Sequence, residues 1–293
     1  MIRTTFIATV AALICSQASA QAPEGWIFRL ESAYLNQDTT DISGGGSFRA
    51  DRTYLRLGGL NRRSDAVNFG LSATLGQSNY DFETSAPWGR IRENTLSFTL
   101  SGENARGMRW FVAPSLRDRA EQGADSGAGR TAGVFGGVSW RVNDRLTIGP
   151  AFGAFEGLGG DNFDVFPAIL LDWEISNRLS LTTGPTLGAS QGAGLSLRYA
   201  FDDDWGLTLS ARRENNRFAL SDTGPTPGGV GQDSSVPVVL SVNYNPHPGL
   251  NVALFAGAEF DGRLEVENAA GSTVRSQSYD TAPLVGMAIS VAF

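Results

Sequence analysis

The sequence predicts an all-β chain that forms a single closed antiparallel transmembrane barrel of fourteen strands, with twelve as the alternative count. Three observations predict it: apolar residues repeat with a period of two, long and short connections alternate, and the last strand has one bulky and one small face. In that strand the bulky face holds Val285, Met287, Ile289, Val291 and Phe293, and the residues between them are only Gly, Ala or Ser. Bulky residues facing lipid and small residues facing a crowded lumen are typical of membrane barrels.

Residues 1–20 have the features of a secretory signal peptide, which leaves residues 21–293 for the barrel. Arg3 precedes an apolar stretch over residues 6–14, and Ala18-Ser19-Ala20 is a small-x-small cleavage site. The single cysteine, Cys15, lies inside this segment and follows Ile14, whereas a lipoprotein signal needs a small residue there. We therefore expect export and a mature chain without thiols, disulfides or a lipid anchor.

Fourteen segments of about ten residues then follow the period-two pattern. They cover residues 26–35, 52–60, 66–77, 92–101, 108–116, 131–142, 146–156, 162–175, 179–188, 193–201, 205–213, 236–244, 250–260 and 281–293. No apolar run after residue 20 approaches the roughly 20 residues that a membrane helix needs. A membrane protein with this sequence is therefore a barrel.

The connections between these segments alternate in length. The longer ones cover residues 36–51, 78–91, 117–130, 157–161, 189–192, 214–235 and 261–280, and compact turns lie between them. Long extracellular loops opposite short periplasmic turns are typical of barrels in the outer membrane of Gram-negative bacteria. An even strand number places both chain ends on the periplasmic side. With no plug before the first strand, any gate has to come from the loops, of which 214–235 and 261–280 are the largest.

Aromatic residues support the same topology, because aromatic side chains prefer the membrane interface. Five of the six tryptophans fall near the predicted periplasmic end, on the bulky face. The predicted girdle consists of Trp26, Trp110, Trp140, Trp173, Tyr199, Phe201, Trp205, Tyr244 and Phe293. A closed barrel pairs the last strand with the first, so we expect Phe293 near Trp26. A soluble secreted β-sandwich is the alternative, but it does not explain this clustering.

The pleat places thirteen charged residues on the inner face, where they are candidates for lining a pore. They are Arg29, Glu31, Arg52, Arg56, Arg109, Arg117, Arg141, Asp164, Asp172, Glu174, Arg198, Arg212 and Glu259. Eight of the thirteen are arginines, and an excess of arginine favours anions. The alternative is that these charges pair with one another and stiffen the wall. Every basic residue of the chain is arginine, the net charge is −7, and no basic stripe suggests a nucleic-acid partner.

The sequence gives little support for catalysis or metal binding, and we expect no enzyme, cofactor or metal. The one histidine, His247, lies between two prolines in a predicted periplasmic turn. Asp202-Asp203-Asp204 could attract Ca²⁺, but a solvated turn is the simpler interpretation.

Two known groups of proteins resemble this sequence. In strand number, length and lack of a plug the chain resembles monomeric fourteen-stranded porins, which implies passive diffusion of small solutes. Residues 236–293 are similar to a group of uncharacterised bacterial barrel proteins, through Val236-Pro237-Val238, Tyr244-Asn245-Pro246, Gly257, Phe260-Asp261-Gly262, Tyr279 and Ala282-Pro283. The final strand resembles the terminal strand by which outer-membrane barrels are recognised, which implies the assembly machinery and outer-membrane lipid as partners.

The sequence therefore leads to a porin-like channel for small polar solutes with a weak preference for anions. The alternative is a non-conducting barrel, closed inside, that binds a partner through its loops. An outer-membrane enzyme is the weakest of the three hypotheses.

Overall fold

The computed structural model describes residues 25–63, 67–104, 107–158, 163–183 and 194–293. The expected signal peptide and its cleavage site lie outside these residues. No helix in the described part of the chain is long and apolar enough to cross a membrane.

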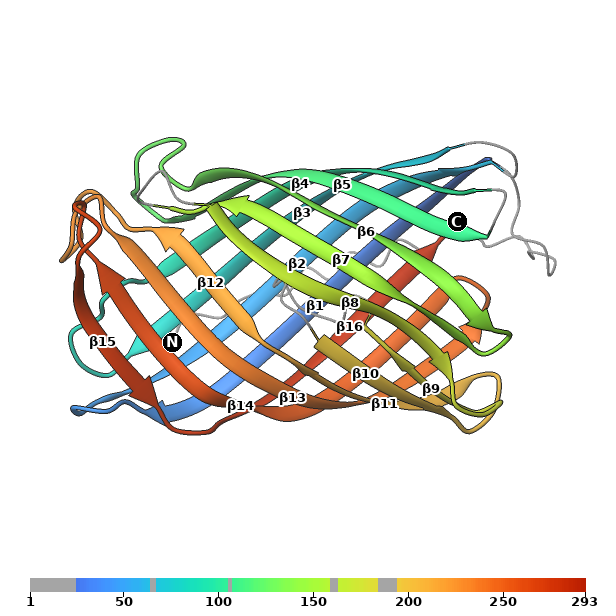
Figure 1. The fold of residues 1–293 in the computed structure, drawn as a ribbon. Helices are drawn as coiled ribbons and strands as arrows, with labels where there is room; N and C mark the ends of the chain where they lie inside the picture. The colour runs from blue at the N-terminus through green and yellow to red at the C-terminus, as the bar shows by residue number, and fades with distance from the viewer. Residues whose placement is uncertain (1–24, 64–66, 105–106, 159–162, 184–193) are drawn as a thin grey trace.

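Fourteen strands of the described chain form the wall of one closed antiparallel barrel, which confirms the predicted fold and strand count (Figure 1). In order around the wall they are β1 (Gly25–Asp41), β2 (Ser47–Arg62), β3 (Asn68–Phe82), β4 (Arg90–Glu103), β5 (Met108–Glu121), β6 (Arg130–Asn143), β7 (Leu146–Glu156), β8 (Phe163–Glu174), β9 (Leu179–Thr182), β10 (Gly194–Ala200), β11 (Trp205–Arg212), β13 (Val230–His247), β14 (Leu250–Glu267) and β16 (Ala282–Ala292).

The barrel closes where β16 pairs with β1, from Arg29 opposite Ala292 to Gln37 opposite Leu284. At the chain end, the backbone amides of Phe28 and Phe293 each donate to the other's carbonyl, at 2.8 and 2.9 Å. The rings of these two residues stack at 6.0 Å, and Phe28 stacks in turn on Trp26 at 5.7 Å. The last residue therefore completes the seam near Trp26, as the sequence predicts.

The wall separates bulky outer residues from a smaller inner face, as the alternation requires. In β16, Val285, Met287 and Ile289 are exposed on the outside, while Leu284 and Ala288 are buried inside. Without a bilayer these outer side chains would leave a large apolar surface in water. An outward apolar belt of this kind is typical of membrane-spanning barrels.

Glycines on the inner wall provide room for aromatic rings on neighbouring strands. A Cβ added at Gly133 would overlap the Phe155 ring, and one added at Gly153 would overlap Phe166. Each glycine faces its ring directly across the strand pair. The rings therefore lie along the wall instead of projecting across the lumen.

Two predicted connections contain regular structure instead of loops. Residues 214–235 include β12 (Glu214–Ala219) and the first residues of β13, and residues 261–280 include the end of β14 and β15 (Thr273–Tyr279). The prediction failed because the apolar residues that alternate here are few and are separated by charged ones. Other strands also run longer than expected; only residues 42–46 separate β1 from β2, instead of residues 36–51.

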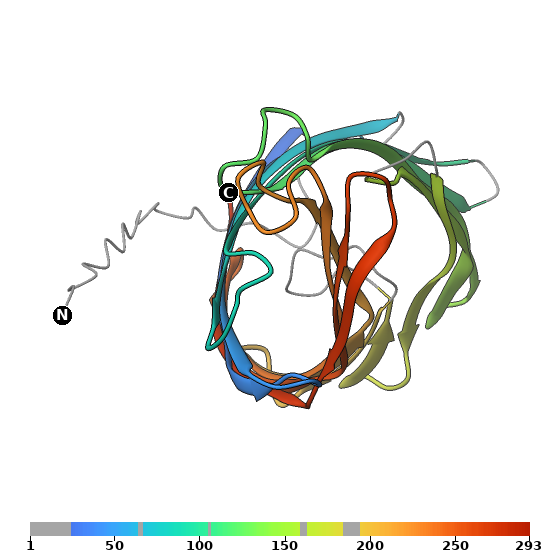
Figure 2. The same cartoon turned by 90° about the vertical axis from the view of Figure 1, so that its left-hand side faces the viewer.

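These segments form a four-stranded sheet, which we call the extracellular extension: β12, residues 230–235 of β13, residues 262–267 of β14, and β15. Seen along the barrel, its orange and red strands run across the mouth instead of following the round wall (Figure 2). One parallel bridge, Ala219 with Ala120, ties β12 to β5 on the far side. The extension therefore shapes one mouth of the barrel, at the end that the sequence predicts to be extracellular.

Candidate functional site

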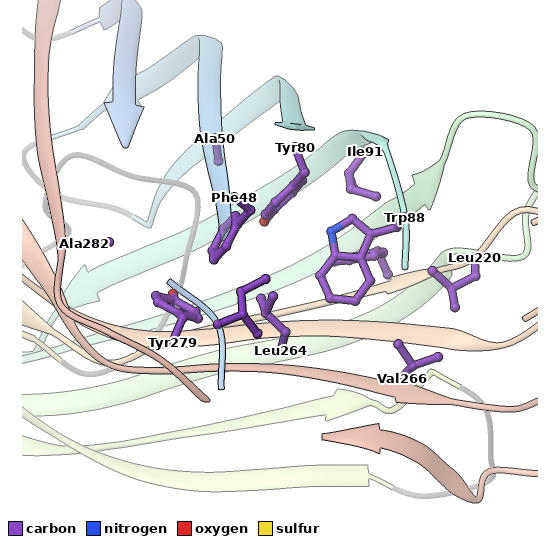
Figure 3. Packing of buried hydrophobic residues seen from close by; sticks show 12 residues of the cluster. Phe48, Ala50, Tyr80, Trp88, Ile91, Leu220, Leu264, Val266, Tyr279 and Ala282 are labelled. Atoms are coloured by element: carbon purple, nitrogen blue, oxygen red, sulfur yellow. The ribbon is translucent and has the colours of Figure 1, made fainter. Parts of the chain in front are cut away.

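The extracellular mouth contains the largest buried apolar cluster of the described residues, which we call the mouth cluster (Figure 3). It joins side chains of β2–β4 and the connections beside them to side chains of the extension, and it also includes Ala282 of β16. Its members are Ile42, Phe48, Ala50, Tyr80, Trp88, Ile91, Phe218, Leu220, Leu264, Val266, Tyr279 and Ala282. Three large rings, Trp88, Phe48 and Phe218, are each only 1% exposed. Membrane barrels usually present water or polar groups inside, so this cluster is a local hydrophobic core that holds the extension down.

Edge-to-face ring contacts fix the packing of the mouth cluster. Trp88 meets Phe218 of β12 at 5.0 Å and Tyr80 of β3 at 5.8 Å. Phe48 of β2 meets Tyr279 of β15 at 5.0 Å. Such pairs contribute about 0.5–1.5 kcal/mol each beyond the burial of their area. Both edges of the extension, β12 and β15, are therefore anchored on the barrel wall.

A buried ionic group, the mouth network, lies beside this cluster. Arg52 of β2 donates to Glu259 of β14 and, at 3.1 Å, to Asp233 of the extension. All three side chains are at most 4% exposed. Removing one partner from such a group is costly, because it leaves an uncompensated buried charge. The network therefore secures the extension to the wall more firmly than an exposed ion pair would.

Two tyrosines complete the network. The Tyr80 hydroxyl donates to Asp233 at 2.7 Å, and the Tyr279 hydroxyl donates to Asp233 at 3.1 Å and to Glu259 at 3.2 Å. Burial raises the pKa of the Tyr279 hydroxyl well above its usual value, and the adjacent carboxylates act in the same direction. The Tyr279 hydroxyl therefore stays protonated and donates to the carboxylates of Asp233 and Glu259, which carry two negative charges against the single positive charge of Arg52.

Below the mouth network, two adjoining cavities occupy the lumen. The first, of about 850 Å³, lies against the periplasmic turns that carry Asp203, Asp204 and His247. The second, of about 370 Å³, is bounded by Arg52 and Glu259 of the mouth network. Both are lined by Tyr54, Arg198, Asn243 and Asn251. Open space lined by both polar and apolar side chains therefore extends from the periplasmic turns to the underside of the mouth.

The thirteen charged residues that the sequence places inside separate into two groups. Seven of them line the cavities: Arg29, Glu31, Arg52, Arg56, Arg198, Arg212 and Glu259. The other six line neither cavity. Arg109 pairs with Glu103 at 3.2 Å, and the Arg117 guanidinium lies 3.7 Å from the centre of the Phe155 ring. Arg141, Asp164, Asp172 and Glu174 occupy ladder positions on β6 and β8. Several lumen charges are paired, as in Arg56 with Glu31 at 3.2 Å.

Sequence reasoning missed the extension's contribution to the site. Asp233 and Tyr279 lie in stretches that the sequence assigns to loops, so no inner or outer face could be given to them. Trp88 is the one tryptophan that does not follow the girdle, and it is the largest fully buried side chain. The departure of Trp88 from the girdle pattern is the one feature of the sequence that points to a buried core at the mouth.

The residues of the predicted girdle lie at the opposite end of the barrel, which the sequence predicts to be periplasmic. Trp26, Trp140, Trp173, Tyr199, Phe201, Trp205, Tyr244 and Phe293 are exposed there, and Trp110 is partly buried beside Gly102. Trp205 and Tyr244 face each other across β11 and β13, and their rings stack at 4.4 Å.

The polar turns at this end carry little chemistry. Asp202 accepts hydrogen bonds from the amides of Asp204 and Trp205, at 3.0 and 2.7 Å, so the triple-aspartate segment is a tight turn. His247 is exposed and lines the first cavity. Within the described residues, no group of three or more His, Cys, Asp or Glu side chains could hold a metal ion.

Comparison with known proteins identifies the fold of this chain. No family model matches the chain, and no curated protein matches it. A solved outer membrane channel from Pseudomonas putida F1 is similar, with 12% identity, a TM-score of 0.50, and coverage of 93% of this chain and 97% of that one. The toluene transporter TodX of Pseudomonas putida has 10% identity, a TM-score of 0.44 and coverage of 92% and 90%. The translocator domain of the autotransporter NalP from Neisseria meningitidis has 12% identity, a TM-score of 0.39 and coverage of 94% and 90%. The chain shares the fold of outer-membrane β-barrels.

Proposed function

We propose that the protein is an outer-membrane channel for small polar solutes, with a weak preference for anions. The observation that supports this most is the pair of adjoining cavities, lined by several charged and hydroxyl side chains, that runs from the periplasmic turns to the mouth network. Fourteen strands lie between the roughly eight that side chains fill and the sixteen that leave an open channel. A lumen of this size is compatible with selective passage of small molecules.

The extension is the proposed gate of this channel. Its apolar face packs into the mouth cluster, whereas Arg217 on its other face donates to Glu267 at 2.8 Å and to the carbonyl of Leu158 at 3.3 Å. Those contacts connect the polar face to the segment that follows β7. A solute can leave the lumen by one of two routes. It passes along the polar face of the extension, or it passes through the mouth after the extension has moved away from the wall.

A non-conducting barrel is the second candidate, and the mouth cluster is the observation that favours it. A dozen buried side chains at the extracellular end oppose free diffusion. In that case the extension would present its polar face to a partner outside the cell. The two candidates differ in whether ions cross the protein.

Conductance in a planar bilayer distinguishes them. We expect the purified protein to give discrete current steps, and a variant with Arg52 replaced by alanine to give larger ones. Under a salt gradient, the reversal potential should indicate anion preference and should move toward zero in Arg198→Ala. Folded protein, checked by heat-modifiable gel mobility, that stays silent in both forms would favour the non-conducting barrel.

The expected setting follows from the same proposal. The protein is exported to the periplasm of a Gram-negative bacterium and inserted into its outer membrane by the assembly machinery, which reads the outward residues of β16. We propose no catalytic role, since the only histidine of the sequence is an exposed residue at the end of β13. Alanine at His247 should therefore leave the conductance steps unchanged.

A further inference from the structure

One side of the second cavity is a wall of hydroxyl groups contributed by neighbouring strands. Six Ser and Thr side chains line it: Ser180, Thr182, Ser196, Thr208, Ser210 and Ser241. They lie in two rows across the ladder of β9, β10, β11 and β13. In one row Ser196 stands opposite both Thr182 and Ser210, and in the other Thr208 stands opposite Ser241. The register therefore brings together groups that are distant in sequence.

Several of these hydroxyls have unused hydrogen-bonding capacity. Ser196 Oγ is buried and has no hydrogen-bond partner in the described part of the chain. Burying such a group without a partner costs about 1–3 kcal/mol, and native structures rarely tolerate it without a reason. Each hydroxyl can donate one hydrogen bond and accept two. The wall is therefore suited to a ligand that is itself rich in hydroxyl groups.

Charge differs between the two ends of this wall. Toward the periplasm stands Arg198, whose side chain is exposed and makes no ion pair or hydrogen bond with any residue that the structure describes. Toward the mouth stand Arg52 and Arg212 together with Glu214 and Glu259, and Arg52 is already paired with Glu259. The carboxylate of a ligand would be repelled by Glu214 and Glu259 at the mouth end of the wall. At the other end, the guanidinium of Arg198 can bind such a carboxylate through two parallel hydrogen bonds. An anionic group would therefore point down, toward Arg198.

Two aromatic rings line the same cavity. The Tyr54 ring lies over Gly76, where an added Cβ would come within 2.8 Å of it, and the Phe255 ring lies over Gly286. Rings held flat on a glycine backbone leave one face free for the C–H groups of a bound molecule. Apolar surface combined with a few converging polar groups is typical of small-molecule sites.

We propose that this cavity is a binding site for a small polyhydroxylated carboxylate, of the size of a single sugar acid. The hydroxyl wall binds the hydroxyl groups, Arg198 binds the carboxylate, and the rings of Tyr54 and Phe255 cover the carbon skeleton. The cavity volume of about 370 Å³ accepts one such molecule. The inference deepens the proposed channel function, because it names the solute class that the lumen selects.

Equilibrium binding to the detergent-solubilised protein tests the site without requiring conduction. Isothermal titration calorimetry with sodium gluconate, glucose and sodium propionate separates the contributions of hydroxyl groups and charge. We expect gluconate to bind at least about tenfold more tightly than either of the others, because only gluconate uses both sets of contacts. Equal affinities for gluconate and propionate would overturn the proposal.

Variants assign the contacts. Ser196→Ala combined with Ser241→Ala should weaken gluconate about tenfold and leave propionate unchanged. Arg198→Ala should weaken gluconate and propionate but leave glucose unchanged. Arg109→Ala and Ser115→Ala are matched controls on the inner wall outside the cavity, and should change nothing. Folded serine or Arg198 variants that keep the parent affinity for gluconate would contradict the site.

Conductance measured on the same samples separates this inference from the proposed function. If the barrel binds gluconate but carries no current, the channel proposal is refuted and the binding-site proposal is supported. A conducting barrel whose current and calorimetric titration are insensitive to gluconate would refute the site alone. If both proposals hold, gluconate should interrupt the current, and Arg198→Ala should shorten the interruptions.

Discussion

The two ends of the barrel use the same kinds of residue in opposite ways. At the extracellular end, Trp88 is 1% exposed and faces inward, and the Arg52–Glu259 pair is buried. At the periplasmic end, Trp205 is 45% exposed and faces outward, and Arg29 stands 3.7 Å from Glu31 in an open cavity. Aromatic and charged residues that face inward and pack together close the extracellular end. The same types of residue leave the periplasmic end open, because there the aromatic rings face outward and the charged side chains stay exposed.

The difference also has an energetic consequence. Contacts in the mouth are desolvated, so breaking one leaves an unpaired charge or a void. Exposed contacts at the periplasmic end exchange with water and lipid headgroups at little cost. We therefore expect the mouth to respond to substitution as one cooperative unit and the periplasmic end to respond residue by residue.

The largest effect is expected at Arg52. Arg52→Ala leaves Asp233 and Glu259 buried without their cation, at a cost of about 3–5 kcal/mol. The extension should detach from the wall, and the backbone amides of β12 and β15 should exchange with deuterium at least about 100-fold faster. Hydrogen–deuterium exchange followed by mass spectrometry measures this directly.

Arg49→Ala is the matched control for this change. Arg49 lies on the same strand and pairs with Asp81 at 2.8 Å, but the two side chains are 60% and 66% exposed. An exposed pair of this kind contributes at most about 1 kcal/mol. Equal protection of β12 and β15 in the two variants would show that the mouth network does not hold the extension.

An intermediate effect is expected on the inner wall between the two ends. Gly133→Ala places a Cβ inside the Phe155 ring, so the ring must turn into the lumen or the strands must separate. Overpacking of this kind costs about 1–3 kcal/mol. The urea midpoint of unfolding should fall and the single-channel conductance should drop.

Gly58→Ala separates this effect from a general loss of glycine. An added Cβ at Gly58, also within the barrel wall, would meet the Ser72 Cβ at 3.5 Å and the Leu71 carbonyl oxygen at 3.7 Å, which are ordinary contacts. This variant should keep the parent midpoint and conductance. A Gly133→Ala protein that behaves like Gly58→Ala would mean that the ring is free to move aside.

The sequence predicts the barrel well because lipid imposes one rule on every strand. The alternation in residues 281–293 places Val285 outside and Ala288 inside, and the structure agrees. The same pleat places Arg52 and Glu259 inside, where the mouth network forms. Membrane-spanning strands can therefore be predicted from the local alternation of side chains along the sequence.

The mouth was not predictable in the same way. Asp233 reaches Arg52 across 181 positions of sequence, and nothing local marks the pair. Phe218 and Leu264 stand among charged residues because the other face of the extension is polar, so the segments resemble loops. Trp88 lies outside any strand and has no alternation to give it a side. Its burial depends on long-range packing alone.

The smallest effect is expected in the periplasmic girdle. Trp205 and Tyr244 stack at 4.4 Å on the lipid-facing side, with each ring more than a third exposed. A double-mutant cycle with alanine at both positions should give a coupling of about 0.5–1 kcal/mol, near the lower limit for aromatic pairs. Urea unfolding followed by the emission of the remaining tryptophans measures it.

The control cycle combines Trp205→Ala with Trp26→Ala, two girdle residues whose rings do not contact each other in the described structure. Their effects should add, because the two rings share no ring partner: Trp26 contacts Phe28 and Phe69, and Trp205 contacts Tyr244. A coupling in the Trp205–Tyr244 pair as large as the loss at Arg52 would contradict the comparison between the two ends. It would mean that the girdle, like the mouth, behaves as one cooperative unit.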